Sequence, residues 1–182
     1  MTRAMLLAVL AVTSCGASSQ VATDRGFNAR ARALDGDTVA VDFRLLGVDA
    51  FESRQLCERR GNCWECGKAA QDLAAKLLRS STADIKLTTT STHGRPVATV
   101  TVDGVDLGER LIRAGLAIPE AQYLGGDPPR AARYAAAFSR AKLDRAGALA
   151  GRWIEPVKWR RGERLQCERR SRSPARLISG RE

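Results

Sequence analysis

The chain has 182 residues, of which 30 are Lys or Arg and 20 are Asp or Glu, so its formal net charge is +10 at pH 7. This length allows one domain with a substantial core, with or without tails, and argues against two full domains. The positive charge favours polyanionic partners and salt-sensitive association with them, although many basic proteins never bind nucleic acid.

The first 17 residues have the pattern of a bacterial export signal. Arg3 precedes an apolar run at residues 4–12, and small residues follow it. The apolar run is too short to span a bilayer. Residues 12–15 also resemble a lipobox, in which Cys15 would be lipidated and anchor the protein to a membrane; ordinary cleavage after residue 17 is the alternative. We therefore expect an exported protein that is periplasmic, envelope-anchored or secreted.

Hydrophobic periodicity divides the rest of the chain into strands and helices. A polar linker at residues 18–28 leads into a strand-like segment at 29–49, and apolar residues at helical spacing predict a helix from Gly67 to about Ser80. Alternating segments at 83–90 and 96–107 predict strands, the second broken by the turn signal Asp103-Gly104. A short helix stopping near Gly115 and a longer one after Pro129 follow.

This order of strands, helix, strands and two helices predicts a small α+β domain at residues 29–160. Residues 161–182 are strongly basic and contain few large apolar side chains, so we expect a basic C-terminal tail. A solvated tail and a dedicated nucleic-acid contact are both compatible with this composition.

Four cysteines remain after Cys15 is set aside: Cys57, Cys63, Cys66 and Cys167. An even number in a chain with an export pattern favours two disulfides. A zinc site is the alternative, because CWEC has the spacing of a zinc knuckle, but there is no second such pair and the single histidine lies apart in sequence. Four cysteines allow three pairings, and the sequence does not choose among them.

The segment LDGDTVAVDFRLLGVDAFE, residues 34–52, carries more charge than a half-buried strand requires. Carboxylates at Asp37 and Asp49, with Glu52 beyond them, would suit a hard cation such as Ca²⁺ together with a general base, and arginines would suit a phosphate. The alternative is structural, with a turn at residues 35–36 and a strand-end cap at Asp49.

Five stretches, DGDTV, FRLLGVDAFE, HGRPVATVTVDG, LGERLIRAGLA and a long helix closing in GRW, occur in the order and approximate spacing of the thermonuclease family, the staphylococcal-nuclease-like proteins. The resemblance runs from about residue 31 to residue 160. It implies an OB-fold, a five-stranded β-barrel packed with about three α-helices. It also implies an endonuclease-type hydrolase that cleaves phosphodiester bonds of DNA and/or RNA with Ca²⁺. We expect a monomer.

The resemblance also implies a role for each matching residue. Asp37 and Asp49 match the metal-binding aspartates of the family, and Ala50 would offer its backbone carbonyl to the ion. The catalytic set matches Arg44, Glu52 and Arg95. A cation and two guanidinium groups would stabilise the charge of the five-coordinate transition state, and Glu52 would orient or deprotonate the attacking water.

The stretch QLCERRGNCWECGKAA resembles a QxC…WxCGxxA segment of exported family members. That resemblance implies a disulfide such as Cys57–Cys66 beside Glu52. Cys63 and Cys167 would then be free to pair and to tie the basic tail to the domain.

The interval between Thr38 and Arg44 is shorter than in the family. If residues 37–44 ran straight they would span about 23 Å, at about 3.3 Å per residue, which is too far for Asp37 and Arg44 to share one phosphate. The sequence therefore predicts either a tight turn within residues 39–43, where Asp42 is the only turn-forming residue, or an Arg44 that points elsewhere.

Three functional hypotheses follow. The leading one is an exported Ca²⁺-dependent nuclease. The second is a catalytically weak nuclease-like module that binds nucleic acid or a protein partner. The third is a disulfide-stapled envelope protein whose basic surface binds acidic polymers, which would need none of the carboxylates.

Overall fold

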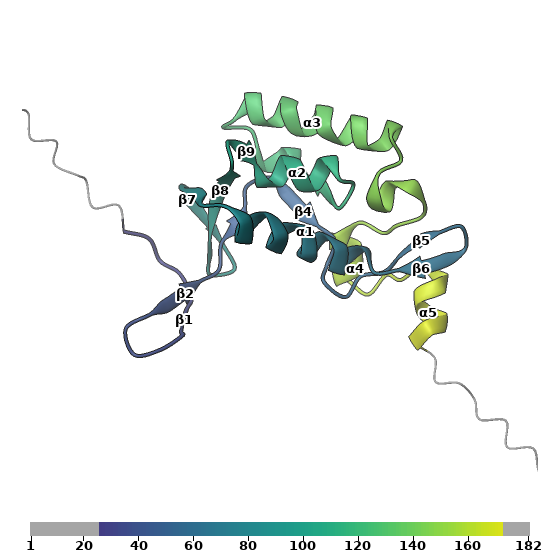
Figure 1. Cartoon of the computed structure of the whole chain (residues 1–182), viewed down its shortest axis with the longest axis horizontal. Helices are drawn as coiled ribbons and strands as arrows, with labels where there is room; N and C mark the ends of the chain where they lie inside the picture. The colour runs from purple at the N-terminus through teal and green to yellow at the C-terminus, as the bar shows by residue number, and fades with distance from the viewer. Residues whose placement is uncertain (1–25, 173–182) are drawn as a thin grey trace, which may run out of the picture.

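The structure is a computed structural model that describes residues 26–172 (Figure 1). The export pattern at residues 1–17, Cys15, most of the linker and the last ten residues lie outside the described part of the chain. Within residues 26–172, no helix combines the length and the apolar character needed to cross a membrane.

The largest sheet has four strands and forms the structural support for the site. Its strands are β3 (Arg44–Leu45), β7 (Ala83–Thr92), β8 (Arg95–Val102) and β9 (Val105–Asp106). β8 pairs in parallel with β3 and antiparallel with β7 and β9. The turn between β7 and β8 consists of His93 and Gly94, both at positive φ. These elements confirm the strands that alternation predicts at 83–90 and 96–107.

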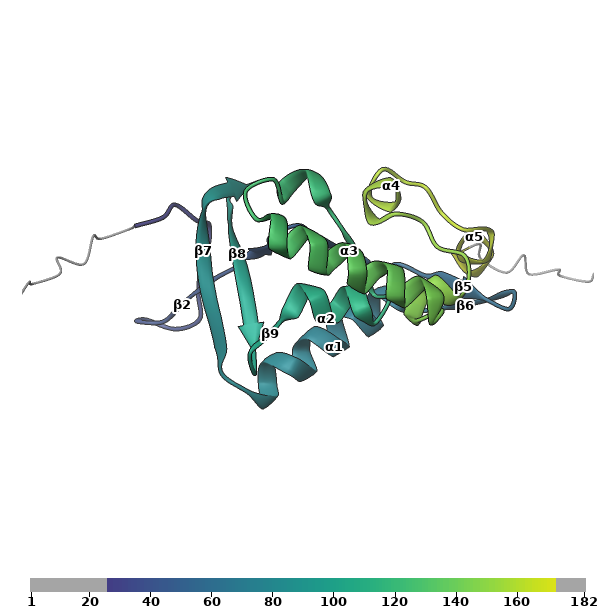
Figure 2. The same ribbon diagram turned by 90° about the horizontal axis from the view of Figure 1, so that it is seen from above.

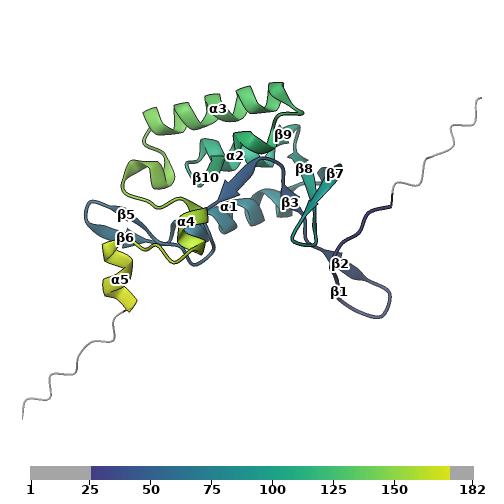
Figure 3. The ribbon, with the colours of Figure 1, turned by 180° about the vertical axis from the view of Figure 1, so that it is seen from behind.

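A separate hairpin, β1 (Ala31–Ala33) and β2 (Val39–Val41), projects from the body of the molecule (Figures 1 and 3). Its turn spans residues 34–38, where Asp35 Oδ1 accepts a hydrogen bond from the backbone N–H of Thr38 at 2.8 Å. The prediction of a turn within residues 39–43 is wrong, because only two residues, in which no turn is assigned, separate β2 from β3. An interval this short leaves too few residues for a second hairpin.

The strand β4 (Val48–Ala50) follows a tight turn at residues 46–47 and pairs antiparallel with β10 (Ala117–Pro119). Gly47 adopts φ +65° in this turn, and a Cβ there would lie 2.5 Å from the side chain of Leu124. Among the described strands the β1–β2, β4–β10 and β3–β8–β7 ladders are separate, so no continuous ladder closes a five-stranded barrel. The fold is nevertheless α+β, as predicted.

Three helices cover one side of the β7 and β8 strands (Figure 2): α1 (Cys66–Ser80), α2 (Leu107–Arg113) and α3 (Pro128–Leu143). Asp106 caps α2 by accepting from the N–H of Glu109, and Asp127 caps α3 by accepting from the N–H of Arg130. The main core cluster lies between these helices and the strands and includes Val48, Val100, Val102, Leu111, Ile112 and Tyr134.

The C-terminal part of the described chain packs onto the domain. It contains η2 (Gly147–Ala150), α4 (Pro156–Arg160) and α5 (Gln166–Arg172), beside a small hairpin of β5 (Cys57–Arg59) and β6 (Asn62–Trp64). A further 3₁₀ turn, η1 (Ala121–Tyr123), precedes α3. Residues 161–172 belong to the segment expected as a tail, yet Leu165 and Glu168 within it are buried.

Two disulfides hold these segments together, Cys57–Cys66 and Cys63–Cys167. They confirm the interpretation of the cysteines as disulfides, with the pairing that the family resemblance implies, and the alternative of a zinc site is wrong because each sulfur is bonded to another. The second disulfide joins α5 to β6. Since Cys167 follows α4 closely in the chain, it also restrains the segment that carries α4.

Candidate active site

Asp49 is a buried carboxylate at the centre of a cluster of ion pairs. It lies on β4 with 2% of its surface exposed. Arg44, on β3, donates from Nη2 to Asp49 Oδ1 at 3.0 Å. The tight turn between β3 and β4 brings the two side chains together although they are five residues apart. A carboxylate removed from water to this extent stays ionised only with such partners.

Arg160, the last residue of α4, is the second partner of Asp49. Its Nη1 and Nη2 donate to Oδ1 and Oδ2 of Asp49, each at 3.0 Å, and Nη1 also donates to Glu52 Oε1 at 2.6 Å. The hydrogen bonds to Asp49 raise the pKa of Arg160 above its ordinary value, against the opposing effect of desolvation. Arg160 therefore carries a permanent positive charge and bridges the carboxylates of Asp49 and Glu52.

Gln55 fixes the backbone of the loop that carries Glu52. The N–H of Glu52 donates to Gln55 Oε1 at 3.1 Å, and the N–H of Gln55 donates to the carbonyl of Glu52 at 2.7 Å. The fully buried Gln55 side chain also donates to the carbonyl of Ile154 at 2.7 Å, which ties the loop to the segment before α4. The Glu52 side chain itself is 35% exposed, so a rigid backbone presents a carboxylate to solvent.

Glu120 is a third carboxylate beside the cluster. Its N–H donates to the carbonyl of Gly47 at 2.9 Å, and Gln122 donates to its side chain. Burial is the main cause that raises the pKa of Glu120, and the negative charge of Asp49 adds to it, while Arg44 and Arg160 oppose it. Glu120 therefore interacts electrostatically with Asp49, Arg44 and Arg160.

Arg95 lies on the same sheet as Arg44. It is the first residue of β8 and is half-buried. In the parallel β3–β8 pair Arg44 lies opposite Val97, and Arg95 is two residues before Val97. Residues two apart on a strand point to the same face, so Arg95 and Arg44 share a face of the sheet. The second predicted arginine can therefore take part in one anion site with the first.

Asp37 is placed differently from the other predicted residues. It is exposed in the turn of the projecting β1–β2 hairpin, where its side chain accepts a hydrogen bond from the hydroxyl of Thr38 at 3.1 Å. Arg44 pairs with Asp49 rather than with Asp37. The structure thus brings together Arg44, Asp49 and Glu52, and it leaves Asp37 outside this cluster.

The donor atoms in this arrangement do not fit a Ca²⁺ ion. Arginines occupy both carboxylate oxygens of Asp49 and one oxygen of Glu52. Ca²⁺ requires six to eight oxygen ligands, whereas no group of three or more His, Cys, Asp or Glu side chains in residues 26–172 is arranged to hold a metal ion. Ala50, predicted to offer its carbonyl, is the last residue of β4 and lies opposite Ala117.

Sequence reasoning did not assign roles to Arg160, Gln55 or Glu120. Arg160 is separated from Asp49 by 111 residues, and a single arginine in a basic segment carries no local signal. For Gln55 the sequence did contain one signal, because Gln55 begins the QLC stretch that resembles a segment of exported family members.

The fold and the cluster together define a small α+β protein with a carboxylate–arginine site at the edge of its sheet. Residues 42–149, more than half of the chain, match the family model of the staphylococcal nuclease homologues. The chain therefore belongs to the staphylococcal nuclease homologue family, whose domain is an OB-fold. The match begins after Asp37 and ends before Arg160. No curated protein matches the chain.

Proposed function

We propose that this protein is an exported nuclease that hydrolyses phosphodiester bonds of DNA or RNA. The observation that supports this most directly is one connected cluster of charges: Arg44 and Arg160 both donate to Asp49, and Arg160 also donates to Glu52. These residues come from β3, β4, the following loop and α4. The family is one of nucleases, which makes a phosphodiester the natural substrate.

In this proposal Glu52 is the general base. Its carboxylate is partly exposed on a backbone that Gln55 holds in place, so it can accept a proton from a water molecule that attacks phosphorus. Only one of its oxygens is bound to Arg160, and the other is available for the water.

The arginines would neutralise the phosphate. Arg44 and Arg95 share one face of the sheet, and a guanidinium can grip two phosphate oxygens in a fork that lysine cannot reproduce. Their charge would favour the five-coordinate transition state, which carries more negative charge on its equatorial oxygens than the ground state does. Asp49, buried between Arg44 and Arg160, would hold both guanidinium groups in position.

The family is generally dependent on Ca²⁺, and Ca²⁺ dependence of this chain remains a prediction. The proposed roles of Glu52 and the arginines do not require Ca²⁺, because the oxygen atoms in the present arrangement do not form a site that suits this ion. The binding role of Asp37 remains a prediction as well, and so does a monomeric state.

The decisive experiment compares the purified mature protein with Glu52→Gln and with the matched control Glu65→Gln, an exposed residue outside the cluster. Degradation of single-stranded DNA and RNA is measured with Ca²⁺ and with a chelator. We expect Glu52→Gln to lose about 10²-fold or more of the cleavage rate, as is usual for a general base, and Glu65→Gln to retain it. Equal rates for the two variants would refute the assignment of Glu52.

A second candidate function, nucleic-acid binding with little hydrolysis, is favoured by one specific observation. Arginines occupy both oxygens of Asp49 and one of Glu52, while Asp37 lies outside the cluster. Tight, salt-sensitive binding without cleavage in any of these conditions would support this function over the first.

The two disulfides are consistent with an oxidising compartment, which supports export. Whether the protein is periplasmic, secreted or anchored through Cys15 depends on residues outside the described part. Mass spectrometry of the mature N-terminus separates these alternatives.

A further inference from the structure

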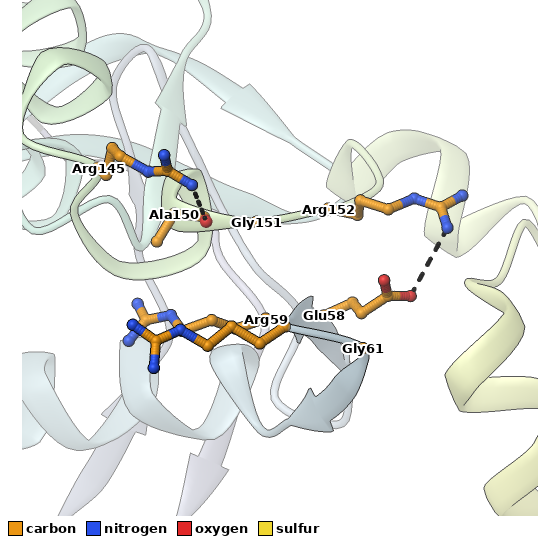
Figure 4. Close-up of a pocket in the computed structure, with 8 residues that line it drawn as sticks. Glu58, Arg59, Gly61, Arg145, Ala150, Gly151 and Arg152 are labelled. Carbon is orange, nitrogen blue, oxygen red and sulfur yellow. Dashed lines mark hydrogen bonds and ion pairs between the residues drawn. The ribbon is translucent and has the colours of Figure 1, made fainter.

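A second cluster of arginines lies outside the candidate active site, around an open cleft of about 810 Å³ (Figure 4). We call it the arginine cleft. Its charged lining residues are Glu58, Arg59, Arg60, Arg145 and Arg152. Four positive charges thus face one carboxylate, and among the other lining residues, two glycines and an alanine, there is no large apolar side chain. A lining of this kind suits a polyanion rather than an apolar small molecule.

Two segments far apart in sequence build the cleft and are joined firmly. Glu58 on β5 and Arg152 exchange both backbone hydrogen bonds, at 2.8 and 2.9 Å. Gly151 permits this approach, because a Cβ there would lie 1.9 Å from the carbonyl of Glu58. The two disulfides hold the β5–β6 hairpin at both strands. The walls of the cleft are therefore set before any ligand arrives.

Several of the guanidinium groups are held in place without being neutralised. Arg59 donates to the carbonyl of Gly147 at 2.7 Å and lies over the ring of Trp64 at 5.5 Å. Arg145 donates to the carbonyl of Ala150 at 3.2 Å. These acceptors are uncharged carbonyl oxygens, so neither hydrogen bond is an ion pair. A pre-positioned arginine loses less side-chain entropy on binding an anion than a free one.

We propose that the arginine cleft binds the phosphodiester backbone of a single-stranded nucleic acid, as a second contact region for the strand that the active site cleaves. This inference rests on the proposed function. Both walls of the cleft continue into the candidate site: residues 57–60 follow the Glu52 loop, and Arg152 precedes α4 with Arg160. Short stretches of chain therefore join the cleft to the two segments that carry the base and the central guanidinium.

The cleft is larger than an inorganic phosphate needs, and its arginines lie on both walls. Repeated phosphates along a strand can reach arginines on both walls. Arginine forks bind phosphate and carboxylate groups alike, so the same charges could attract an acidic polypeptide. The family is one of nucleases, which favours a nucleic-acid strand as the occupant.

The test uses the mature, disulfide-bonded protein with Glu52→Gln in every sample, so that the strand is bound and not cleaved. Arg60→Gln and Arg145→Gln are combined, because neither residue takes part in an ion pair within the described structure. The matched control combines Arg79→Gln and Arg113→Gln, which remove the same charge from exposed positions on α1 and α2. The dissociation constant of a labelled oligothymidylate is measured by fluorescence anisotropy at several salt concentrations.

We expect the cleft variant to bind about 10-fold more weakly and to lose about 1.4 from the slope of log K against log salt, as for two lost phosphate contacts on a single strand. The control variant should change affinity less than 2-fold. Equal losses in the two variants would show a general charge effect and overturn the proposal.

A variant that gains affinity guards against misfolding as an explanation. Glu58 contributes the one carboxylate among the lining residues in the described chain and lies 3.7 Å from Arg152. Glu58→Gln should release Arg152 and bind the strand about 2- to 5-fold more tightly, with a steeper salt slope. Unchanged or weaker binding contradicts the proposal.

Two competitors separate the sources of the ligand chemistry. Inorganic phosphate at the same phosphate concentration should displace the strand poorly, and so should polyglutamate of equal charge. Full displacement by phosphate would identify a small-anion site, and selective displacement by polyglutamate would identify an acidic-protein site; either result overturns the proposal. Because cleavage is not measured here, failure of the cleft assignment leaves the Glu52 test unaffected, and the reverse is also true.

Discussion

Among single residues, the candidate site depends most on how the buried carboxylate of Asp49 is paired. Its carboxylate is almost entirely buried and receives three hydrogen bonds from two guanidinium groups. Arg44 supplies one of them and Arg160 the other two. Burial of a charge with this many partners is stable, whereas removal of one partner leaves part of the desolvation cost uncompensated.

Arg160→Gln tests this dependence. The variant should lower the free energy of unfolding by about 1–3 kcal/mol, because two charge-assisted hydrogen bonds to Asp49 are lost. It should also raise the affinity for Ca²⁺, because the guanidinium and a cation compete for the same oxygens of Asp49 and Glu52. Urea unfolding and calorimetric titration with Ca²⁺ measure the two effects.

Arg161→Gln is the matched control for both measurements, since Arg161 is the exposed neighbour at the end of α4. If the two variants unfold at the same urea concentration and bind Ca²⁺ equally, Arg160 neither stabilises the protein through Asp49 nor competes with Ca²⁺ for the carboxylates.

At the scale of elements, helix α1 and the Glu52 loop are in unusually close contact. Gly67, the second residue of α1, donates its N–H to the carbonyl of Gln55 at 3.1 Å. A Cβ at Gly67 would lie 1.6 Å from the carbonyl oxygen of Glu52, which is backbone and cannot move aside alone. The start of the helix therefore sets the position of the Glu52 loop.

Gly67→Ala should destabilise the protein and impair cleavage together. Alanine is ordinarily more favourable than glycine in a helix by about 1 kcal/mol, so any loss must come from the clash with the loop. We expect a net loss of about 1–3 kcal/mol, measured by urea unfolding, and a lower cleavage rate.

Gly125→Ala provides the control, because a Cβ at Gly125 meets nothing within 4 Å. A Gly67→Ala protein as stable and active as the control would mean that the loop tolerates displacement and that its position is not critical.

At the scale of the whole molecule, the disulfides decide how the C-terminal segment is held. Cys63 and Cys167 are 104 residues apart, so this disulfide closes most of the domain into one loop. It anchors α5 to the β5–β6 hairpin (Figure 3). The segment that carries α4 and Arg160 is thus held at both ends, by the hydrogen bond from Gln55 to Ile154 and by the disulfide at Cys167. Long-loop disulfides restrict the unfolded chain more than short ones.

Replacing Cys63 and Cys167 together by serine should lower the free energy of unfolding by about 5 kcal/mol, as loop-closure entropy predicts for a loop of about 100 residues. The measurement is urea unfolding of the oxidised proteins. Reductant should destabilise the wild-type protein more than the double variant, in which only Cys57–Cys66 remains. A loss of unfolding free energy no larger than that caused by a serine substitution at an exposed position would contradict this prediction.

Most of the local structure could be predicted from the sequence alone. The period of apolar residues predicted α1, α2 and α3, and alternation predicted β7 and β8, because these patterns depend on neighbours a few residues apart. Arg44, Asp49 and Glu52 were expected in one site from the resemblance to the thermonuclease family. They lie within nine residues of one another, and a tight turn after Arg44 brings Arg44 and Asp49 together.

Only the tertiary structure decided which charges meet. Asp37 is close in sequence but stands apart, because the short interval after β2 leaves no chain for a second hairpin. Arg160 is distant in sequence but pairs with Asp49, because α4 folds back over β4. The arginine cleft likewise joins β5 to the segment after α3. Contacts of this kind arise from packing and disulfides between segments far apart in the chain, such as the 111 residues between Asp49 and Arg160, and no local pattern encodes them.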